Sequence, residues 1–433
     1  MALAGFAQQA PASHSFSLAD AIKYAYEHQD SVKNAALDVQ SAEYKIKETI
    51  GIGLPQINGS ANFQDYFKVP TQVAPGEPFG QPGKLVALSF ALKYSSTLSL
   101  DASQILFDGS FLVGLKASRT YKDLSVRNLD RTKVETSVNV TKAYYQVLVN
   151  DEQIKLFDAN IKQLKEQLDQ TTQQNKQGFV EKIDVDRLTV QYNNLVTNRG
   201  NIIRSLIINY QLLKFQMGMP IEEDLDLKDK LIDVSLGSEL AAATTDTAFY
   251  HNRVEYKLLE TAKKLNEFDL LEKKAKYLPS LSAIGNYSGA FYENKLSNIY
   301  NRGFTFSYVG LRLSIPIFSG GQRSNQVKQA QVSVLKAQNN LESAKNGFKL
   351  QANSARIAYE NSVQSLNNQK RSRELAQEVL RVARIKYQQG VGSSIEVTQA
   401  QTEIENADNA YIQALYAALV SKVDLDKAYA RLN

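Results

Sequence analysis

One spacing between motifs occurs twice in this chain. The segment Phe107-Asp108-Gly109 is followed, 71 residues after its phenylalanine, by Gly178. The segment Phe318-Ser319-Gly320-Gly321 is followed, 72 residues after its phenylalanine, by Gly390. Two marks that recur at offsets of 211 and 212 residues with this spacing indicate an internal duplication. The 433 residues are therefore expected to form one pseudo-symmetric body and not a row of unrelated domains.

Long helices are predicted between the two marks of each copy. No proline occurs from residue 83 to 219 or from residue 317 to 433, so nothing in these segments interrupts a helix. In the second segment a stripe of small and apolar residues has a mean spacing of 3.6, which predicts one continuous face along a nearly straight helix. At 1.5 Å per residue, each such helix would be roughly 100 Å long. The stripe consists of Ala330, Val334, Ala337, Leu341, Ala344, Phe348, Ala352, Ala355, Tyr359, Val363 and Leu366.

Each long helix is expected to reverse at its internal glycine, because Gly178 and Gly390 suit a left-handed helix cap. After Gly390, the segment from Ser393 to Glu396 has the pattern of a capping box that would begin the return helix. The first copy has Glu181 where Ser393 lies, so its cap is expected to be less regular. The prediction is one long antiparallel helical hairpin in each copy.

Between Pro55 and Phe107 the hydrophobic period changes from that of a helix to two. Even-numbered residues from 86 to 102 are mostly apolar and odd-numbered ones mostly polar, which predicts one long strand with an apolar and a polar face. The polar set comprises Ser89, Lys93, Ser95, Thr97, Ser99 and Asp101. Residues 57–69 alternate in the same way and are predicted to form the partner strand.

The second copy is expected to contain a matching pair of strands, over residues 281–292 and 304–317. In the latter segment the apolar parity switches after Tyr308, which indicates either a bulge or a change of environment along the strand.

Aromatic residues are concentrated in these strands. Residues 63–94 and 287–308 contain 13 of the 40 phenylalanines and tyrosines, as in the aromatic girdles of a transmembrane β-barrel. The alternative, a soluble sandwich with buried aromatics, is weaker because four strands cannot enclose a core. Four strands cannot close a barrel alone either, and open sheet edges are prohibitive in lipid. Several chains are therefore expected to contribute strands to one barrel.

Composition excludes several classes of function. There is no cysteine, and His14, His28 and His251 are far apart in the sequence, so ligands for a transition metal are lacking. No nucleophile elbow, phosphate-binding loop or complete dinucleotide motif is present, so neither an enzyme nor a cofactor is predicted. The net charge of +5 is spread over 50 basic and 45 acidic residues without a basic tract, which does not indicate nucleic-acid binding. No apolar run is long enough for a membrane helix.

The N-terminus leaves two interpretations open. Met1 to Gln9 is uncharged and rich in alanine, like the end of a secretory signal peptide that lacks its basic start. A flexible N-terminus is the other interpretation.

Taken in order, several segments resemble the TolC family of outer membrane efflux proteins, and together they extend over almost the whole chain. The segments are Leu54-Pro55 and Leu278-Pro279 before the strand pairs, Ile317 to Gly321 before a long helix, Gly390 to Val397 with its weaker copy Gly178 to Val185, and Leu213 to Pro220.

The resemblance implies a homotrimer of mixed α and β structure. Four strands per chain would form one transmembrane β-barrel in outer membrane lipid, continuing into a long periplasmic α-helical barrel of coiled-coil hairpins. The expected parts are a first copy, 1–215, with a helix, a β-hairpin over 56–103 and a helical hairpin over 108–215 with its tip near 178; an equatorial region, 216–253; and a second copy, 254–433, with a helix, a β-hairpin over 280–317 and a helical hairpin over 320–430 with its tip near 390.

In this family a periplasmic adaptor protein docks at the hairpin tips, and an inner-membrane transporter of the RND, ABC or MFS type completes the pump. The resemblance assigns this docking role to Gly178, Phe179, Val180, Asp184, Gly390, Val391, Gly392 and Glu396. The implied function is a passive export duct for efflux or type I secretion in a Gram-negative outer membrane. The alternative is a periplasmic coiled-coil adaptor or scaffold, which would be expected to carry a membrane anchor and a compact β-domain within its hairpin.

The chain departs from the family at the helix that enters the second tip. The family tends to place acidic residues there, whereas no acid lies between Glu378 and Gly390 in this chain. Arg381 and Arg384, three residues apart, would share one helix face and give the closed pore entrance a basic lining. The alternative is that they bind acids of a neighbouring helix, such as Asp169 or Glu166.

Overall fold

The structure is a computed structural model that describes residues 14–231 and 248–432, and it divides into two compact units. Each unit contains segments of both sequence copies, so the units do not follow the repeat. The division of the chain at 216–253 remains a prediction. Met1 to Gln9, the possible signal remnant, lies outside the described residues, as does 232–247 within the expected equatorial region. Unit 1 is formed by Met1–Val39, Leu124–Glu260 and Asn339–Asn433, and unit 2 by Gln40–Asp123 and Thr261–Gln338.

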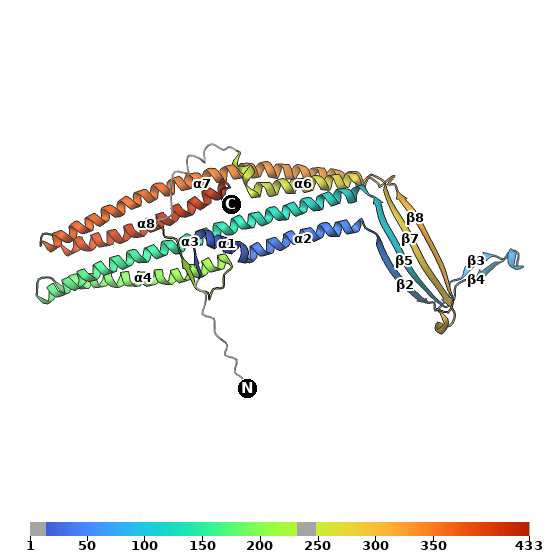
Figure 1. Ribbon diagram of the computed structural model, residues 1–433, viewed down its shortest axis with the longest axis horizontal. Helices are drawn as coiled ribbons and strands as arrows, with labels where there is room; N and C mark the ends of the chain where they lie inside the picture. Colours follow the sequence, from blue (N-terminus) through green and yellow to red (C-terminus); the bar gives the residue numbers. More distant parts are fainter. Residues whose placement is uncertain (1–13, 232–247, 433) are drawn as a thin grey trace, which may run out of the picture. The chain divides into compact units, whose positions relative to one another are not determined.

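Unit 2 contains a four-stranded antiparallel sheet in the order β2-β5-β7-β8 (Figure 1). Its central pair joins the two copies, because β5 comes from the first and β7 from the second. The expected two main strands per copy are confirmed, and they form a single sheet. The strands are β2 (Gln56–Asp65), β5 (Tyr94–Phe107), β7 (Ser280–Glu293) and β8 (Gly303–Ser314).

The prediction of one long strand from residue 86 to 102 is wrong in extent. The chain leaves the strand conformation at residues 89–93, so β4 (Leu85–Leu88) and β5 are separate strands. β4 pairs with β3 (Gln72–Pro75) in a two-stranded hairpin that contains the short helix η1 (Glu77–Phe79). Alternation in a sequence records which face a side chain occupies, but it does not record which strand supplies the hydrogen-bond partners. The break was therefore invisible in the pattern.

One face of the four-stranded sheet carries small polar side chains. Residues opposite one another in antiparallel strands share a face, so Asn58, Asp101 and Asn286 form one row. Asn286 Nδ2 donates to Asp101 Oδ1 at 2.8 Å, and in the next row Ser288 Oγ lies 3.0 Å from Ser99 Oγ. The predicted polar face therefore extends over β2, β5 and β7.

The parity switch within residues 304–317 is not a bulge. β8 pairs with β7 without a shift in register, and the irregularity of the sheet lies near the end of β5, at Ile105. Tyr308 lies opposite Asn286, and Phe306 lies two residues before it on the same face. The aromatic side chains of β8 thus share a face with polar residues, which is the change of environment that the sequence left as the second possibility.

Two helical hairpins, α3/α4 and α7/α8, account for much of the chain (Figure 1). α3 has 68 residues and α7 has 67, as the nearly equal spacings of the motifs predicted. Every residue of the stripe from Ala330 to Leu366 is buried or half-buried, which confirms the helical period. The hairpin helices are α3 (Gly109–Lys176), α4 (Lys182–Met217), α7 (Gln322–Gln388) and α8 (Ser394–Ala428).

The Phe-x-Gly marks lie where a strand gives way to a helix. Asp108 caps α3, because its Oδ1 accepts from the Phe111 N–H at 2.9 Å. Gly320 and Gly321 precede α7 with φ of 57° and 80°, values that glycine adopts at little cost.

Shorter elements complete the described chain. They are β1 (His14–Phe16), α1 (Leu18–His28), α2 (Asp30–Ile52), β6 (Leu225–Leu227), η3 (Phe249–Asn252), α6 (Val254–Ala275) and η4 (Leu296–Asn298), with β1 and β6 forming a parallel pair.

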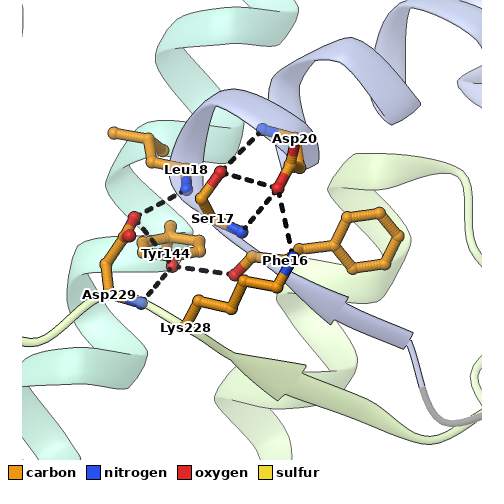
Figure 2. Close-up of polar contacts among 7 residues, drawn as sticks. All are labelled: Phe16, Ser17, Leu18, Asp20, Tyr144, Lys228 and Asp229. Atoms are coloured by element: carbon orange, nitrogen blue, oxygen red, sulfur yellow. Dashed lines mark hydrogen bonds and ion pairs between the residues drawn. The ribbon is translucent and has the colours of Figure 1, made fainter.

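A buried tyrosine ties the start of α1 to the segment after β6 (Figure 2). The Tyr144 hydroxyl on α3 lies 3.1 Å from the Phe16 carbonyl and 3.1 Å from Asp229 Oδ2, which also accepts from the Leu18 N–H at 2.7 Å. Burial raises the pKa of Tyr144 above its ordinary value, so the hydroxyl remains neutral and able to donate.

The same network includes the N-terminal cap of α1 (Figure 2). Ser17 and Asp20 form a reciprocal capping box, and Lys228 lies 3.7 Å from the Asp20 carboxylate. The helices α1, α3 and α4 also share one apolar core, which includes Tyr144 of this network. Its buried members are Ala21, Ala25, Val140, Ala143, Tyr144, Val147, Leu148, Leu213, Met217 and Met219.

Gly218, which ends α4, offers a test of this packing. Its φ is 71°, and a Cβ there would lie 2.6 Å from the His28 carbonyl oxygen and 2.7 Å from the Gln29 nitrogen. We expect Gly218→Ala to lower the free energy of unfolding by about 2 kcal/mol or more, from the left-handed conformation and the clash together. Thermal and denaturant unfolding followed by circular dichroism would measure the loss.

Gly347→Ala is the matched control. Gly347 lies within α7, and a Cβ added there would meet no described atom within 4 Å, so this change should leave stability equal or higher by up to about 1 kcal/mol. Equal effects of the two substitutions would contradict the packing described for Gly218.

Candidate functional site

The first tip, residues 178–184, is a tight turn between α3 and α4. Gly178 has a φ of 81°, and the Phe179 N–H donates to the Gln174 carbonyl at 2.9 Å, which closes the end of α3. Asn175 Nδ2 donates to the Val180 carbonyl at 2.8 Å, and this hydrogen bond stabilises the turn. α4 then begins after Glu181 without a side-chain cap, in agreement with the expectation that this cap is less regular than that of the second copy.

The second tip, residues 390–396, turns in the same way between α7 and α8. Gly390 has a φ of 73°, and the N–H groups of Val391 and Gly392 both donate to the Lys386 carbonyl. Only half of the predicted capping box forms: Ser393 Oγ accepts from the Glu396 N–H at 3.2 Å, and the cap of α8 consists of this bond alone. The Glu396 side chain is exposed to solvent.

Both tips present a pair of apolar side chains to solvent. Phe179 and Val391 occupy equivalent positions and are 77% and 78% exposed. Ile183 and Ile395 follow four residues later in each copy and are also exposed, so each pair spans the start of its return helix. The two isoleucines were not among the residues predicted from the sequence, although each lies five residues after its tip glycine. Exposed apolar groups repeated in this way are typical of a protein-binding surface.

Asp184 and Glu396, which the sequence placed in equivalent docking positions, have different surroundings. Asp184 is half-buried, accepts a short hydrogen bond from Ser394 Oγ, and lies 3.6 Å from Arg187. It therefore joins the first tip to the start of α8. Its surroundings favour a bridging role between the hairpins, whereas the exposed Glu396 is accessible to another protein.

Towards the tips, the apolar clusters of unit 1 each draw on one hairpin only. Leu164 and Leu195 belong to a cluster between α3 and α4, whereas Leu380 and Ile404 belong to a cluster between α7 and α8. Farther from the tips, a third cluster joins the hairpins through Val149 of α3 and residues of α7 and α8. Hydrophobic packing therefore stabilises each hairpin separately near its tip.

The contacts between the hairpins in this region are mainly polar. Gln191 Nε2 donates to the Thr398 carbonyl at 3.2 Å, and Asn160 Nδ2 donates to Asp408 Oδ2 at 2.8 Å. Asp408 also accepts from Arg373 Nε at 2.6 Å and is nearly buried, so this carboxylate connects α3, α7 and α8. No feature of the sequence distinguished Asp408 from the many acids on solvated helix faces.

The structure separates the two arginines proposed for the pore entrance. Arg381 is exposed and makes a bidentate ion pair with Glu378 on its own helix. Arg384 is half-buried, and its Nη2 donates to Gln401 on α8 at 2.9 Å. Burial lowers the pKa of Arg384, and the negative charge of Glu166 opposes this shift. The two arginines therefore have different environments, although they are only three residues apart.

Glu405 lies near the interface between the two hairpins and has a raised pKa. It lies four residues after the fully buried Gln401, whose Nε2 is 3.4 Å from Glu405 Oε1, and three residues before Asp408. Burial raises its pKa, the charge of Asp408 adds to this shift, and the hydrogen bond from Gln401 reduces it.

This raised pKa predicts a pH-dependent contribution to stability. The folded state favours the protonated form of Glu405, so stability falls as the pH rises from its ordinary pKa of 4.5 through the raised value. We expect Glu405→Gln to increase the free energy of unfolding at pH 7, by on the order of 1 kcal/mol, and to have no effect below pH 4.5.

Glu403→Gln is the control, because Glu403 is an exposed acid on the same helix and its substitution should change little at either pH. Unfolding curves at pH 4 and pH 7 would test the difference. A loss of stability in Glu405→Gln at pH 7 would contradict the described environment.

Within residues 14–231 and 248–432, no group of three or more histidines, cysteines or acids could hold a metal ion. Within the same residues, no helix has both the length and the apolar character needed to cross a membrane. The tips expose apolar side chains, and the two hairpins are joined near the tips mainly by hydrogen bonds.

Comparisons with known proteins agree with this geometry. The family model described as "Outer membrane efflux protein" matches residues 21–198 and 272–431. The chain is 24% identical to outer membrane protein TolC of Escherichia coli K12, over 78% of this chain and 70% of that protein. It is also 24% identical to the alkaline protease secretion protein AprF of Pseudomonas aeruginosa, over 78% and 69%. The open state of the Neisseria gonorrhoeae MtrE outer membrane channel has the same fold, with a TM-score of 0.73 and 19% identity over 95% of this chain and 88% of that one.

Proposed function

The chain belongs to the outer membrane efflux protein family, and from this premise we propose that it forms a passive trimeric export duct. It is an outer membrane channel of an efflux or secretion system, with a periplasmic helical part. Channels of this type work with periplasmic adaptors and inner-membrane transporters. We propose in addition that three chains form the duct, that the polar face of the sheet lines it, and that the tips of the helical hairpins bind the adaptor.

The way in which the strands of the sheet pair is the main support for a trimeric duct. In the described chain, β2 and β8 each pair with one strand of the four-stranded sheet, so each has one edge of free N–H and C=O groups. A lipid bilayer contains no water to satisfy these groups, and every backbone polar group there needs a partner within the protein. Three copies would place β8 of one chain beside β2 of the next and close a barrel of twelve strands.

The two faces of the sheet support an aqueous interior. The polar rows of β2, β5 and β7, including Asp101 and Ser99, would face the water of the duct. Large apolar side chains on the other face, such as Leu100 and Tyr287, are exposed in the single chain and would face lipid. Part of the aromatic surface of β8 would then lie inside the duct, because Phe306 and Tyr308 share the polar face.

The tips are proposed as the docking sites for a periplasmic adaptor. Phe179 with Ile183, and Val391 with Ile395, give two related apolar patches of unequal size. An adaptor that binds both would bury side chains that are now in water, a favourable change of about 25 cal/mol per Å² of apolar surface. The polar contacts between the hairpins could then be exchanged for water as the partners open the entrance. A transporter of the RND, ABC or MFS type would supply the energy.

Conductance tests this function directly. Reconstituted protein should elute as a trimer from size-exclusion chromatography with light scattering, and should give stable channels in a planar bilayer. A monomer in detergent without conductance would overturn the proposal. The alternative of an adaptor or scaffold predicts no channel and no retention in the outer membrane fraction, so cell fractionation separates it from the duct.

We retain a basic lining of the pore entrance as a narrower proposal, now centred on Arg381. Its side chain is exposed, whereas Arg384 is engaged with Gln401 inside the protomer. Arg381→Ala should shift the permeability ratio towards cations, by on the order of twofold, because a ring of three positive charges is removed.

Arg384→Ala is the comparison within the same helix. It should change stability more than selectivity, since it removes a half-buried hydrogen bond. Reversal potentials in asymmetric salt would measure both variants. Unchanged selectivity in Arg381→Ala would count against the basic lining.

A further inference from the structure

A charged cavity of about 440 Å³ lies within unit 1, and no residue of the two tips lines it. Its wall is formed where α1, α3, the start of α6 and the end of α8 meet. It is within the size range of small-molecule sites. The charged residues that line it are Arg127, Asp130, Lys133, Arg253, Glu255, Lys257 and Lys427.

The lining has an excess of positive charge. Five of its side chains are basic and two are acidic, so the cavity has a formal excess of three positive charges. The chain as a whole has 50 basic and 45 acidic residues, so this local ratio is not a property of the general surface. Like charges that share one cavity repel one another, and an anion in the cavity would relieve this repulsion.

One of the two acids is already neutralised by a buried arginine. Glu255 receives two hydrogen bonds from Arg253, from Nε at 3.2 Å and from Nη2 at 2.9 Å. Arg253 is 2% exposed, its Nη1 donates to Gln351, and its guanidinium lies over the Phe348 ring. Burial acts to raise the pKa of Glu255, but the bonds and charge of Arg253, with the charge of Lys427, lower it below its ordinary value. This pair forms a rigid, neutral part of the wall.

The remaining cations are held at the cavity by different elements. Arg127 and Lys133 both belong to α3, and the Lys133 ammonium lies 5.8 Å from the centre of the Tyr26 ring. Lys427 lies in the last turn of α8. Because these groups come from separate helices that pack together, the fold itself creates the cluster.

One buried donor at the cavity supports an anionic ligand. Arg127 Nε is buried and has no hydrogen-bond partner among the described residues, although unsatisfied buried donors are uncommon and costly. The helix α6 also begins in this wall, but its first turn already carries Glu255, whose carboxylate accepts from its own backbone N–H. A phosphate or carboxylate group would therefore satisfy the free donor of Arg127.

We propose that this cavity binds a small ligand that carries two or more phosphate or carboxylate groups. A single monovalent ion would balance only one of the three excess charges, whereas a multivalent anion would bridge Arg127 and Lys427. The site involves none of the residues proposed for docking or conduction, so it holds whether or not the trimeric duct is correct.

Calorimetric titration of the purified full-length protein in detergent tests the site. Pyrophosphate serves as the phosphate probe and citrate as the carboxylate probe, and stronger binding of one identifies the preferred chemistry. Saturable binding, weakened by salt, is expected for at least one of them. In Arg127→Gln/Lys427→Gln the affinity should fall at least about tenfold, because two charge-assisted hydrogen bonds are lost.

Two further variants keep the test decisive if that double variant folds poorly. Asp130→Asn removes the second acid of the cavity and should tighten binding. Arg131→Gln removes a positive charge from the neighbouring position of α3, where Arg131 faces Glu135 at 3.8 Å outside the cavity, and should leave binding unchanged. Absence of saturable binding by both probes would overturn the proposal, as would equal affinities in all four proteins.

Discussion

The need of every backbone polar group for a partner in lipid is the constraint on which the proposed assembly depends. The sheet of four strands satisfies its interior through β5 and β7, but β2 and β8 each keep a free edge within the described chain. In the outer membrane such edges are satisfied only by further strands, and further copies of the same chain can supply them. The internal duplication suits this requirement, because each copy contributes two strands and all four strands lie in one continuous sheet.

In the helical part, apolar contacts stabilise each hairpin, and polar contacts join the two hairpins near their tips. Near the tips each hairpin has its own apolar cluster, around Leu164 in the first and Leu380 in the second. Between them lie hydrogen bonds such as that of Asn160 with Asp408 and that of Gln191 with the Thr398 carbonyl. Apolar surface is costly to expose to water, whereas a hydrogen bond can be replaced by one to water at small net cost. The hairpins can therefore keep their internal structure while the contacts between them change.

Several local features could be predicted because they depend on residues close in the sequence. Gly178 and Gly390 adopt the left-handed conformation, and the strand-to-helix marks lie at the start of α3 and α7. The predictions failed or stayed incomplete where a partner on another element decides. The split between β4 and β5 arises because β4 pairs with β3, and Arg384 differs from Arg381 because it donates a hydrogen bond to Gln401 of another helix. The positive cavity between α1, α3, α6 and α8 was equally invisible, because its cations are spread from residue 127 to residue 427.

The sequence by itself determined the duplication, the lengths of the helical arms, the positions of their turns and the alternation of the strands. These depend on backbone conformations that single residues favour and on periodicities of 2 and 3.6. Only the tertiary structure decided which strands pair, which acids are buried and which basic groups meet. Those outcomes depend on contacts between residues of different elements, some of them hundreds of positions apart, and a periodic pattern contains no such contact. Asp184 illustrates both: its place at a tip is evident from the chain, but its bond to Ser394 of the other hairpin is not.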